Sequence, residues 1–110
     1  SFNVIGNSPL VLRESLLDEV YTMGENFVEA AKRVVAPGMN GPFCIEGVYD
    51  ENAKFTSFEF SARIVAGSNI YMDGSPYYSL LFNESMSMGK RIAREIKIAT
   101  EKNQLDKITT

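Results

Sequence analysis

Two short runs of aromatic and β-branched residues, separated by a polar tetrapeptide, most constrain how this chain can fold. The first run, GPFCIEGVYD, occupies residues 41–50, and the second, FTSFEFSAR, occupies residues 55–63. Residues 51–54 between them can join only antiparallel strands, because parallel strands need a crossover of about a dozen residues or more. We therefore predict a β-hairpin over residues 41–63.

A helix is predicted immediately before this hairpin. Apolar residues recur with a 3.6-residue period from Leu16 to Val35, a spacing typical of an amphipathic helix over residues 13–35. The stripe is interrupted at Gly24, and an interior glycine costs up to about 1 kcal/mol relative to alanine. We interpret Gly24 as the mark of a close helix contact.

The rest of the chain is predicted to form a turn-rich loop followed by helices. SPYYSLLF predicts a short helix, and Ser87 is placed to cap a final one. One face of that final helix carries Met88, Ile92, Ile96 and Ala99. The order helix, hairpin, loop, helix predicts the α+β class, with an antiparallel hairpin or sheet packed with helices. No repeat or linker interrupts residues 1–110, which predicts one domain or sub-domain.

Composition excludes several kinds of chemistry. The 110 residues contain no histidine and a single cysteine, Cys44, so a histidine-dependent triad, an imidazole zinc site and an internal disulfide are excluded within this chain. A net charge of -3 argues against a dedicated nucleic-acid binder. With no membrane span or signal peptide in the sequence, we expect a cytoplasmic protein. The start lacks methionine, which suggests that more chain lies upstream.

The predicted hairpin register opposes two carboxylates. With residues 51–54 as the loop, Asp50 faces Phe55 and every further pair has numbers that sum to 105, so Glu46 lies opposite Glu59. Like charges directly opposed across two strands destabilise a hairpin by up to about 1 kcal/mol. We therefore expect a positive group to lie between Glu46 and Glu59.

Strand alternation divides the predicted hairpin into a charged face and an apolar face. The charged face carries Cys44, Glu46, Val48, Ser57, Glu59, Ser61 and Arg63, and the apolar face carries Phe43, Ile45, Tyr49, Thr56, Phe58 and Phe60. Mg²⁺ commonly takes one or two protein carboxylates together with substrate phosphate oxygens, and an arginine nearby can hold a phosphate. The charged face thus predicts a phosphoryl-transfer or ligase site. The alternative is a solvated pair of surface glutamates with Arg63 as an ion-pair partner, and a one-residue slip would remove the pairing.

The residues of this hairpin resemble a known family. GPFCIEGVY followed by Glu59 in FEFSAR is similar to the metal-binding hairpin of ATP-grasp ligases, where an acidic residue and an E-x-N-x-R motif hold Mg²⁺ and the ATP phosphates. This chain has E-x-S-x-R, so Ser61 replaces the usual asparagine and is a weaker ligand. The stretches GNSPLVLRESLL, APGMNGPFCIEGVY, FEFSARIVAGSNIY, GSPYYSLLF and SMGKRIAREIK extend the resemblance over the whole chain. They are similar to the C-terminal part of the archaeal formate-dependent 5-formaminoimidazole-4-carboxamide ribonucleotide synthetases.

The resemblance implies a fold, a reaction and a set of site residues. It implies the C-terminal portion of an ATP-grasp domain in a cytoplasmic homo-oligomer, with the nucleotide-binding domains upstream. ATP would phosphorylate formate, and the amine of 5-aminoimidazole-4-carboxamide ribonucleotide would attack the formyl phosphate. By the same resemblance, Glu46 and Glu59 are Mg²⁺ (or Mn²⁺) ligands, Ser61 is near the cofactor and Asn7 contacts the ribonucleotide. Arg63 is our candidate catalytic residue, because a guanidinium can neutralise charge on the transferred phosphoryl group.

Other features and functions stay open from the sequence. Gly67-Ser68-Asn69 is either a phosphate-binding nest or an ordinary turn. The basic residues of the final helix are either a solvated face or an anion-binding surface; they are Lys90, Arg91, Arg94 and Lys97. The alternatives to a formate-dependent ligase are another ATP-grasp carboxylate-amine ligase and a nucleotide-binding or oligomerisation module without catalysis.

Overall fold

The computed structural model describes residues 3, 5–67 and 72–109. The chain divides into two compact units. One unit comprises residues 13–65, and the other comprises residues 1–12 and 66–110. The α+β class is confirmed, with three α-helices and a two-stranded antiparallel sheet among the described residues.

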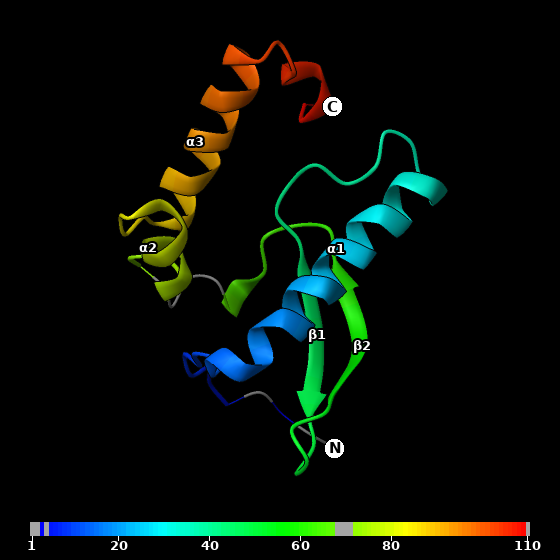
Figure 1. The fold of residues 1–110 in the computed structure, drawn as a ribbon, viewed down its shortest axis with the longest axis vertical. Helices are drawn as coiled ribbons and strands as arrows, with labels where there is room; N and C mark the ends of the chain where they lie inside the picture. Colours follow the sequence, from blue (N-terminus) through cyan, green and yellow to red (C-terminus); the bar gives the residue numbers. More distant parts are fainter. Residues whose placement is uncertain (1–2, 4, 68–71, 110) are drawn as a thin grey trace. The chain divides into compact units, whose positions relative to one another are not determined.

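The unit of residues 13–65 consists of a helix and a hairpin. A 3-10 turn, η1 (Glu14–Leu16), leads into α1 (Leu17–Val34), and the hairpin is β1 (Cys44–Tyr49) followed by β2 (Phe55–Ser61) (Figure 1). The helix predicted over residues 13–35 is confirmed. Acidic residues in its first turn, and Lys32 and Arg33 in its last, suit the helix dipole.

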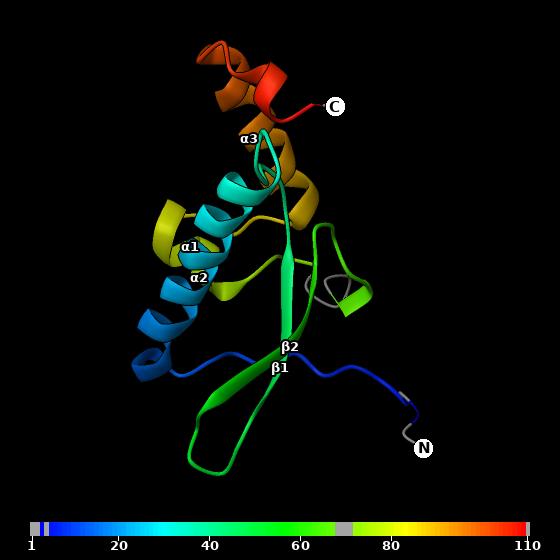
Figure 2. The ribbon, with the colours of Figure 1, turned by 90° about the vertical axis from the view of Figure 1, so that its right-hand side faces the viewer.

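An aromatic contact joins α1 to one face of the hairpin. The ring of Phe27 lies 5.4 Å from that of Phe43 and 4.7 Å from that of Phe60, measured between centroids. Figure 2 shows α1 on one side of the two strands. Gly24 also faces Phe43, but a Cβ at Gly24 would lie 3.8 Å from the ring, an ordinary van der Waals distance. The contact at Gly24 is therefore not close enough to require glycine, contrary to our interpretation of the sequence.

The other unit contains the two shorter helices. These are α2 (Pro76–Phe82) and α3 (Met88–Glu101), followed by the 3-10 turn η3 (Leu105–Lys107) (Figure 1). Both α-helices begin at a serine cap: Ser75 Oγ accepts from the Tyr77 amide and Ser87 Oγ from the Lys90 amide. The short helix predicted from SPYYSLLF and the helix capped by Ser87 are both confirmed.

The buried core of the described residues is small. Met86 and Ala99 are the two hydrophobic residues that are fully buried there, with 2% and 7% of their surface exposed. By contrast, Val34 in α1 and Leu80 in α2 are 81% and 78% exposed. Short units expose a large fraction of their surface because surface area falls more slowly than volume as a chain shortens. The described part of the chain therefore buries few apolar side chains.

Candidate functional site

The open half of the hairpin has the predicted register. Cys44 pairs with Ser61, Ile45 with Phe60 and Glu46 with Glu59. Directly opposed residues of an antiparallel pair project from the same face, with Cβ atoms about 4.5–5.5 Å apart. The prediction that two glutamates oppose each other is therefore confirmed.

The turn half of the hairpin has a different register. Gly47 pairs with Ser57, Val48 with Thr56 and Tyr49 with Phe55, so each of these pairs is one residue out of step with the open half. The predicted pairing of Asp50 with Phe55 is wrong. In its place Asp50 closes the turn: its carboxylate accepts hydrogen bonds from the amides of Asn52 and Lys54, both at 2.9 Å.

The change of register is a β-bulge that leaves Phe58 without a partner in β1. Because opposed residues share a face, Ser57 lies on the face of Gly47, opposite to the face of Glu59. Thr56 likewise moves to the face of Val48. Both assignments differ from the prediction, which assumed unbroken alternation. Phe58, assigned to the apolar face, is 67% exposed.

The charges of the two glutamates affect the pKa of the Cys44 thiol. Cys44 has no disulfide partner and is half-buried in β1. Burial raises the pKa of the Cys44 thiol above its usual value, and the negative charges of Glu46 and Glu59 raise it further. The thiol and both carboxylates thus share one electronegative face.

The predicted positive neighbour of the glutamates is not supplied by Arg63. Its Nη1 donates a 2.9 Å hydrogen bond to the carbonyl oxygen of Ile64. The ion pairs found in residues 3, 5–67 and 72–109 join other residues, so neither Glu46 nor Glu59 has a cationic partner there. Of the alternative reading, the ion pair with Arg63 is not found among the described residues, while Glu59 is exposed and Glu46 half-buried, as expected of a surface pair.

The donor set suits a cation that brings further ligands of its own. No group of three or more acidic, cysteine or histidine side chains that could hold a metal occurs in the described part of the chain. The two strands offer two carboxylate groups and the hydroxyl of Ser61. Ser61 lies two residues beyond Glu59 on the same face of β2. Mg²⁺ and Mn²⁺ favour oxygen ligands, and Mg²⁺ sites commonly use one or two carboxylates with phosphate oxygens and water completing the shell. The residues present fit such a site and would not form a closed all-protein cage.

Two further candidates lie outside the hairpin unit. Asn7 belongs to the other unit and is exposed. Gly67 is described, but Ser68 and Asn69 lie outside the described residues. The roles of Asn7 and of the Gly67-Ser68-Asn69 segment stay predictions.

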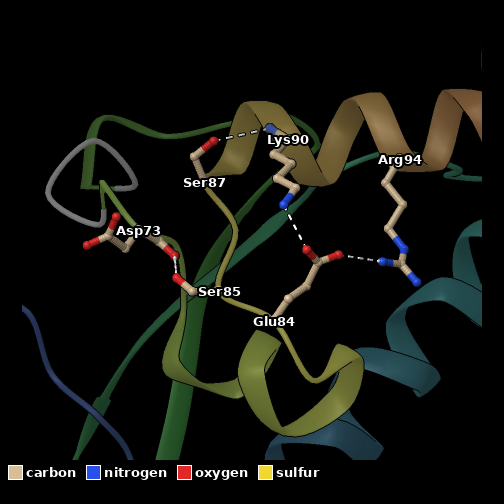
Figure 3. Close-up of polar contacts among 6 residues, drawn as sticks. All are labelled: Asp73, Glu84, Ser85, Ser87, Lys90 and Arg94. Carbon is tan, nitrogen blue, oxygen red and sulfur yellow. Dashed lines mark hydrogen bonds and ion pairs between the residues drawn. The ribbon is translucent and has the colours of Figure 1, made fainter.

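Three of the four basic residues of α3 named above, Lys90, Arg91 and Arg94, are engaged by acidic side chains. Glu84 binds Lys90 Nζ at 2.8 Å and Arg94 Nη1 at 3.0 Å (Figure 3). Arg91 pairs with Glu95 along the helix. The hydrogen bond from Lys90, its charge and that of Arg94 lower the pKa of Glu84. The sequence offered no direct signal for Glu84, because its partners lie six and ten residues away, across the loop between α2 and α3. These contacts favour a structural role for the basic residues over an anion-binding surface.

A second contact holds the loop between α2 and α3. Ser85 Oγ donates to the carbonyl oxygen of Asp73 at 2.9 Å, just before Gly74, whose φ is +78° (Figure 3). A Cβ at Gly74 would collide with the carbonyl oxygen of Met86. The positive φ and the close approach of the Met86 backbone therefore both require glycine at position 74.

Comparison with known proteins identifies the family. The family model described as "Domain of unknown function (DUF1297)" matches residues 1–110, so the chain belongs to that family. Its curated relatives include proteins named 5-formaminoimidazole-4-carboxamide-1-(beta)-D-ribofuranosyl 5'-monophosphate synthetase. The relative from Nitrosopumilus maritimus is 91% identical over 110 residues, which are 100% of this chain and 32% of that protein. The relatives from Cenarchaeum symbiosum and Metallosphaera sedula are 74% and 53% identical over the whole chain and are covered to 32% and 33%.

The resemblance to these synthetases is thus confirmed over the whole chain, although the chain spans about a third of the length of the relatives it matches. In the part of the chain that the structure describes, no helix has the length and apolar character needed to cross a bilayer.

Proposed function

We propose that this chain supplies one wall of the active site of an ATP- and formate-dependent ligase of purine biosynthesis. The ligase forms a carbon-nitrogen bond, converting 5-aminoimidazole-4-carboxamide ribonucleotide, formate and ATP into the formamido ribonucleotide, ADP and phosphate. Formyl phosphate is the intermediate that the ribonucleotide amine attacks. The observation that carries the proposal is the opposed pair Glu46 and Glu59, found in a chain that is 91% identical to a named synthetase.

Glu46 and Glu59 are proposed to hold Mg²⁺ or Mn²⁺. Two formal negative charges on one strand face, with no cation paired to them in the described residues, create a potential that favours a divalent ion. When bound, such an ion neutralises charge on the ATP phosphates. Ser61 is placed to orient a water molecule or a phosphate oxygen beside the carboxylates, because a neutral hydroxyl both donates and accepts.

Arg63 and Asn7 are proposed to act on the transferred group and on the ribonucleotide. The Arg63 guanidinium is exposed and makes one hydrogen bond to a backbone carbonyl, so it has donors left for phosphoryl or acyl phosphate oxygens. The amide of Asn7 offers a donor and an acceptor, which suits a carboxamide or ribose edge. We infer an ATP-grasp fold, a cytoplasmic location and a homo-oligomer for the full-length protein, and we expect the isolated chain to be inactive.

A chimaera tests this proposal. We define it as the Nitrosopumilus maritimus relative whose matching 110 residues are replaced by this chain, with the unmodified relative as reference. The chimaera is expected to release ADP only when ATP, formate and the ribonucleotide are all present. An active reference with an inactive but folded chimaera would refute the proposed role of this chain.

Substitutions in the chimaera test the individual residues. Glu46→Gln and Glu59→Gln should each weaken Mn²⁺ binding in the presence of ATP by about tenfold or more, measured by electron paramagnetic resonance, because each removes a ligand charge. Glu51→Gln is the matched control, since Glu51 lies in the exposed hairpin turn. If Glu59→Gln changes neither Mn²⁺ binding nor turnover, the metal site is wrong. Unchanged turnover in Arg63→Met would remove Arg63 from the catalytic residues.

A further inference from the structure

A β-bulge lies directly beside the carboxylate pair. The ladder is regular through Glu46 and Glu59, and the next pair along is Gly47 with Ser57, so the extra residue Phe58 falls at the edge of the proposed metal site. A bulge bends its strand and increases the local twist, and it thereby changes the direction in which the adjacent side chains project. The direction of Glu59 relative to Glu46 therefore depends on this irregularity.

Burial does not explain the extra residue. Phe58 is 67% exposed, whereas Phe60 on the same strand contacts the ring of Phe27. A ladder without Phe58 would keep every pair that the hairpin now has, including Glu46 with Glu59. The extra residue thus adds neither a strand pair nor a packed ring contact, and what it changes is the local geometry of β2.

Gly47, which flanks the bulge, makes room for Phe55 and Thr56 of the facing strand. A Cβ at Gly47 would lie 2.6 Å from the carbonyl oxygen of Thr56 and closer still to Cζ of Phe55. Real Cβ atoms do not approach other atoms so closely, and one of the two obstacles is backbone, which cannot rotate away. The Phe55 ring fills this space and also lies 5.0 Å from the ring of Tyr49, centroid to centroid. An aromatic ring laid over a strand glycine holds the two strands in place.

We propose that Gly47 and the bulge at Phe58 form a positioning device that aims the Glu46 and Glu59 carboxylates at a shared divalent cation. This inference rests on the proposed function, since it concerns the same metal site. Neither Gly47 nor Phe58 touches the ion; each acts through the backbone of the strand that carries a ligand. Residues that orient metal ligands typically change metal affinity by 10–100-fold when altered.

Two pairs of variants in the chimaera separate positioning from stability. Gly47→Ala forces the strands apart at the bulge, and Gly41→Ala is its control because a Cβ at Gly41 meets nothing within 4 Å. Deletion of Phe58 removes the bulge, and Phe58→Ala is its control because it keeps the backbone residue and removes only the ring. The readouts are the Mn²⁺ dissociation constant of the folded protein, with ATP present, and the thermal midpoint.

Gly47→Ala and the deletion are each expected to weaken Mn²⁺ binding by about tenfold or more, while both controls stay within about twofold of the parent. If Gly47→Ala does not fold, the deletion decides. The positioning role is overturned if Gly47→Ala and the deletion lower the thermal midpoint but bind Mn²⁺ like the parent, while Glu59→Gln binds Mn²⁺ more weakly. If Glu59→Gln also binds Mn²⁺ like the parent, the proposed function fails and this inference fails with it.

Discussion

The effect of Glu59→Gln on the stability of the folded protein is expected to change sign when the metal is added. In the absence of divalent ions, Glu59 faces Glu46 across the strands with no cationic partner among the described residues. Two unit charges about 6 Å apart in water repel by about 0.7 kcal/mol, and the screening length of about 10 Å at 0.1 M salt reduces this to about 0.4 kcal/mol. Glutamine keeps the size of the side chain and removes this repulsion. The metal-free variant should therefore be slightly more stable than its parent.

The bound state should show the opposite order. At a concentration of 100 times the dissociation constant, a ligand stabilises the folded protein by about 2.7 kcal/mol. A tenfold loss of Mn²⁺ affinity lowers this contribution by about 1.3 kcal/mol, which exceeds the repulsion that was removed. With Mn²⁺ and ATP, Glu59→Gln should therefore be less stable than its parent by about 1 kcal/mol.

Thermal unfolding of the chimaera in EDTA, and again with Mn²⁺ and ATP, measures both changes. The gain in EDTA should shrink in 1 M salt, where the screening length is about 3 Å. Glu51→Gln is the control, because it removes a carboxylate that lies outside the paired strands. A gain that does not depend on salt would refute the reasoning, since the two charges would then not be opposed. Equal stabilisation of parent and variant by Mn²⁺ would remove Glu59 from the metal site.

Three further predictions concern single side chains. Gly24→Ala should raise the free energy of unfolding by up to about 1 kcal/mol, because α1 gains a better helix former and the new Cβ lies 3.8 Å from Phe43; a loss of stability in thermal unfolding would show that the helix contact is tighter. Ser87→Ala should cost about 1 kcal/mol in urea denaturation, because α3 loses its cap, and an unchanged midpoint would contradict this. Alkylation of Cys44 by iodoacetamide should stay slow until the pH rises above the usual thiol range, because the pKa of this thiol is raised. Glu59→Gln should shift the pH profile of the alkylation rate to lower pH, and an unshifted profile would show that the Glu59 charge does not act on the thiol.

The local elements could be predicted because they depend on short-range patterns. The predicted pairing of Glu46 with Glu59 is found because the bulge at Phe58 offsets the one-residue error in the predicted turn register. Helix periodicity indicated α1, the stretch SPYYSLLF indicated α2, the Ser87 cap marked α3, and the tetrapeptide between two β-rich runs set the hairpin. The bulge escaped prediction because alternation was assumed to continue through Gly47. A glycine inside a strand is itself a sign of a bulge, so the signal was present in FCIEGVY.

The sequence by itself determined which elements form, because helix periodicity, helix caps and turns are specified by neighbouring residues. The opposition of the two glutamates also needs the bulge, since the observed turn register without it would pair Glu46 with Phe58. Only the tertiary structure decided what surrounds them. The bulge depends on how the Phe55 ring and the Thr56 carbonyl crowd Gly47 across the strands. Glu84 finds Lys90 and Arg94 only once α2 and α3 are joined by their folded loop. Contacts of this kind arise from side chains meeting in three dimensions, which periodicity along the chain does not encode.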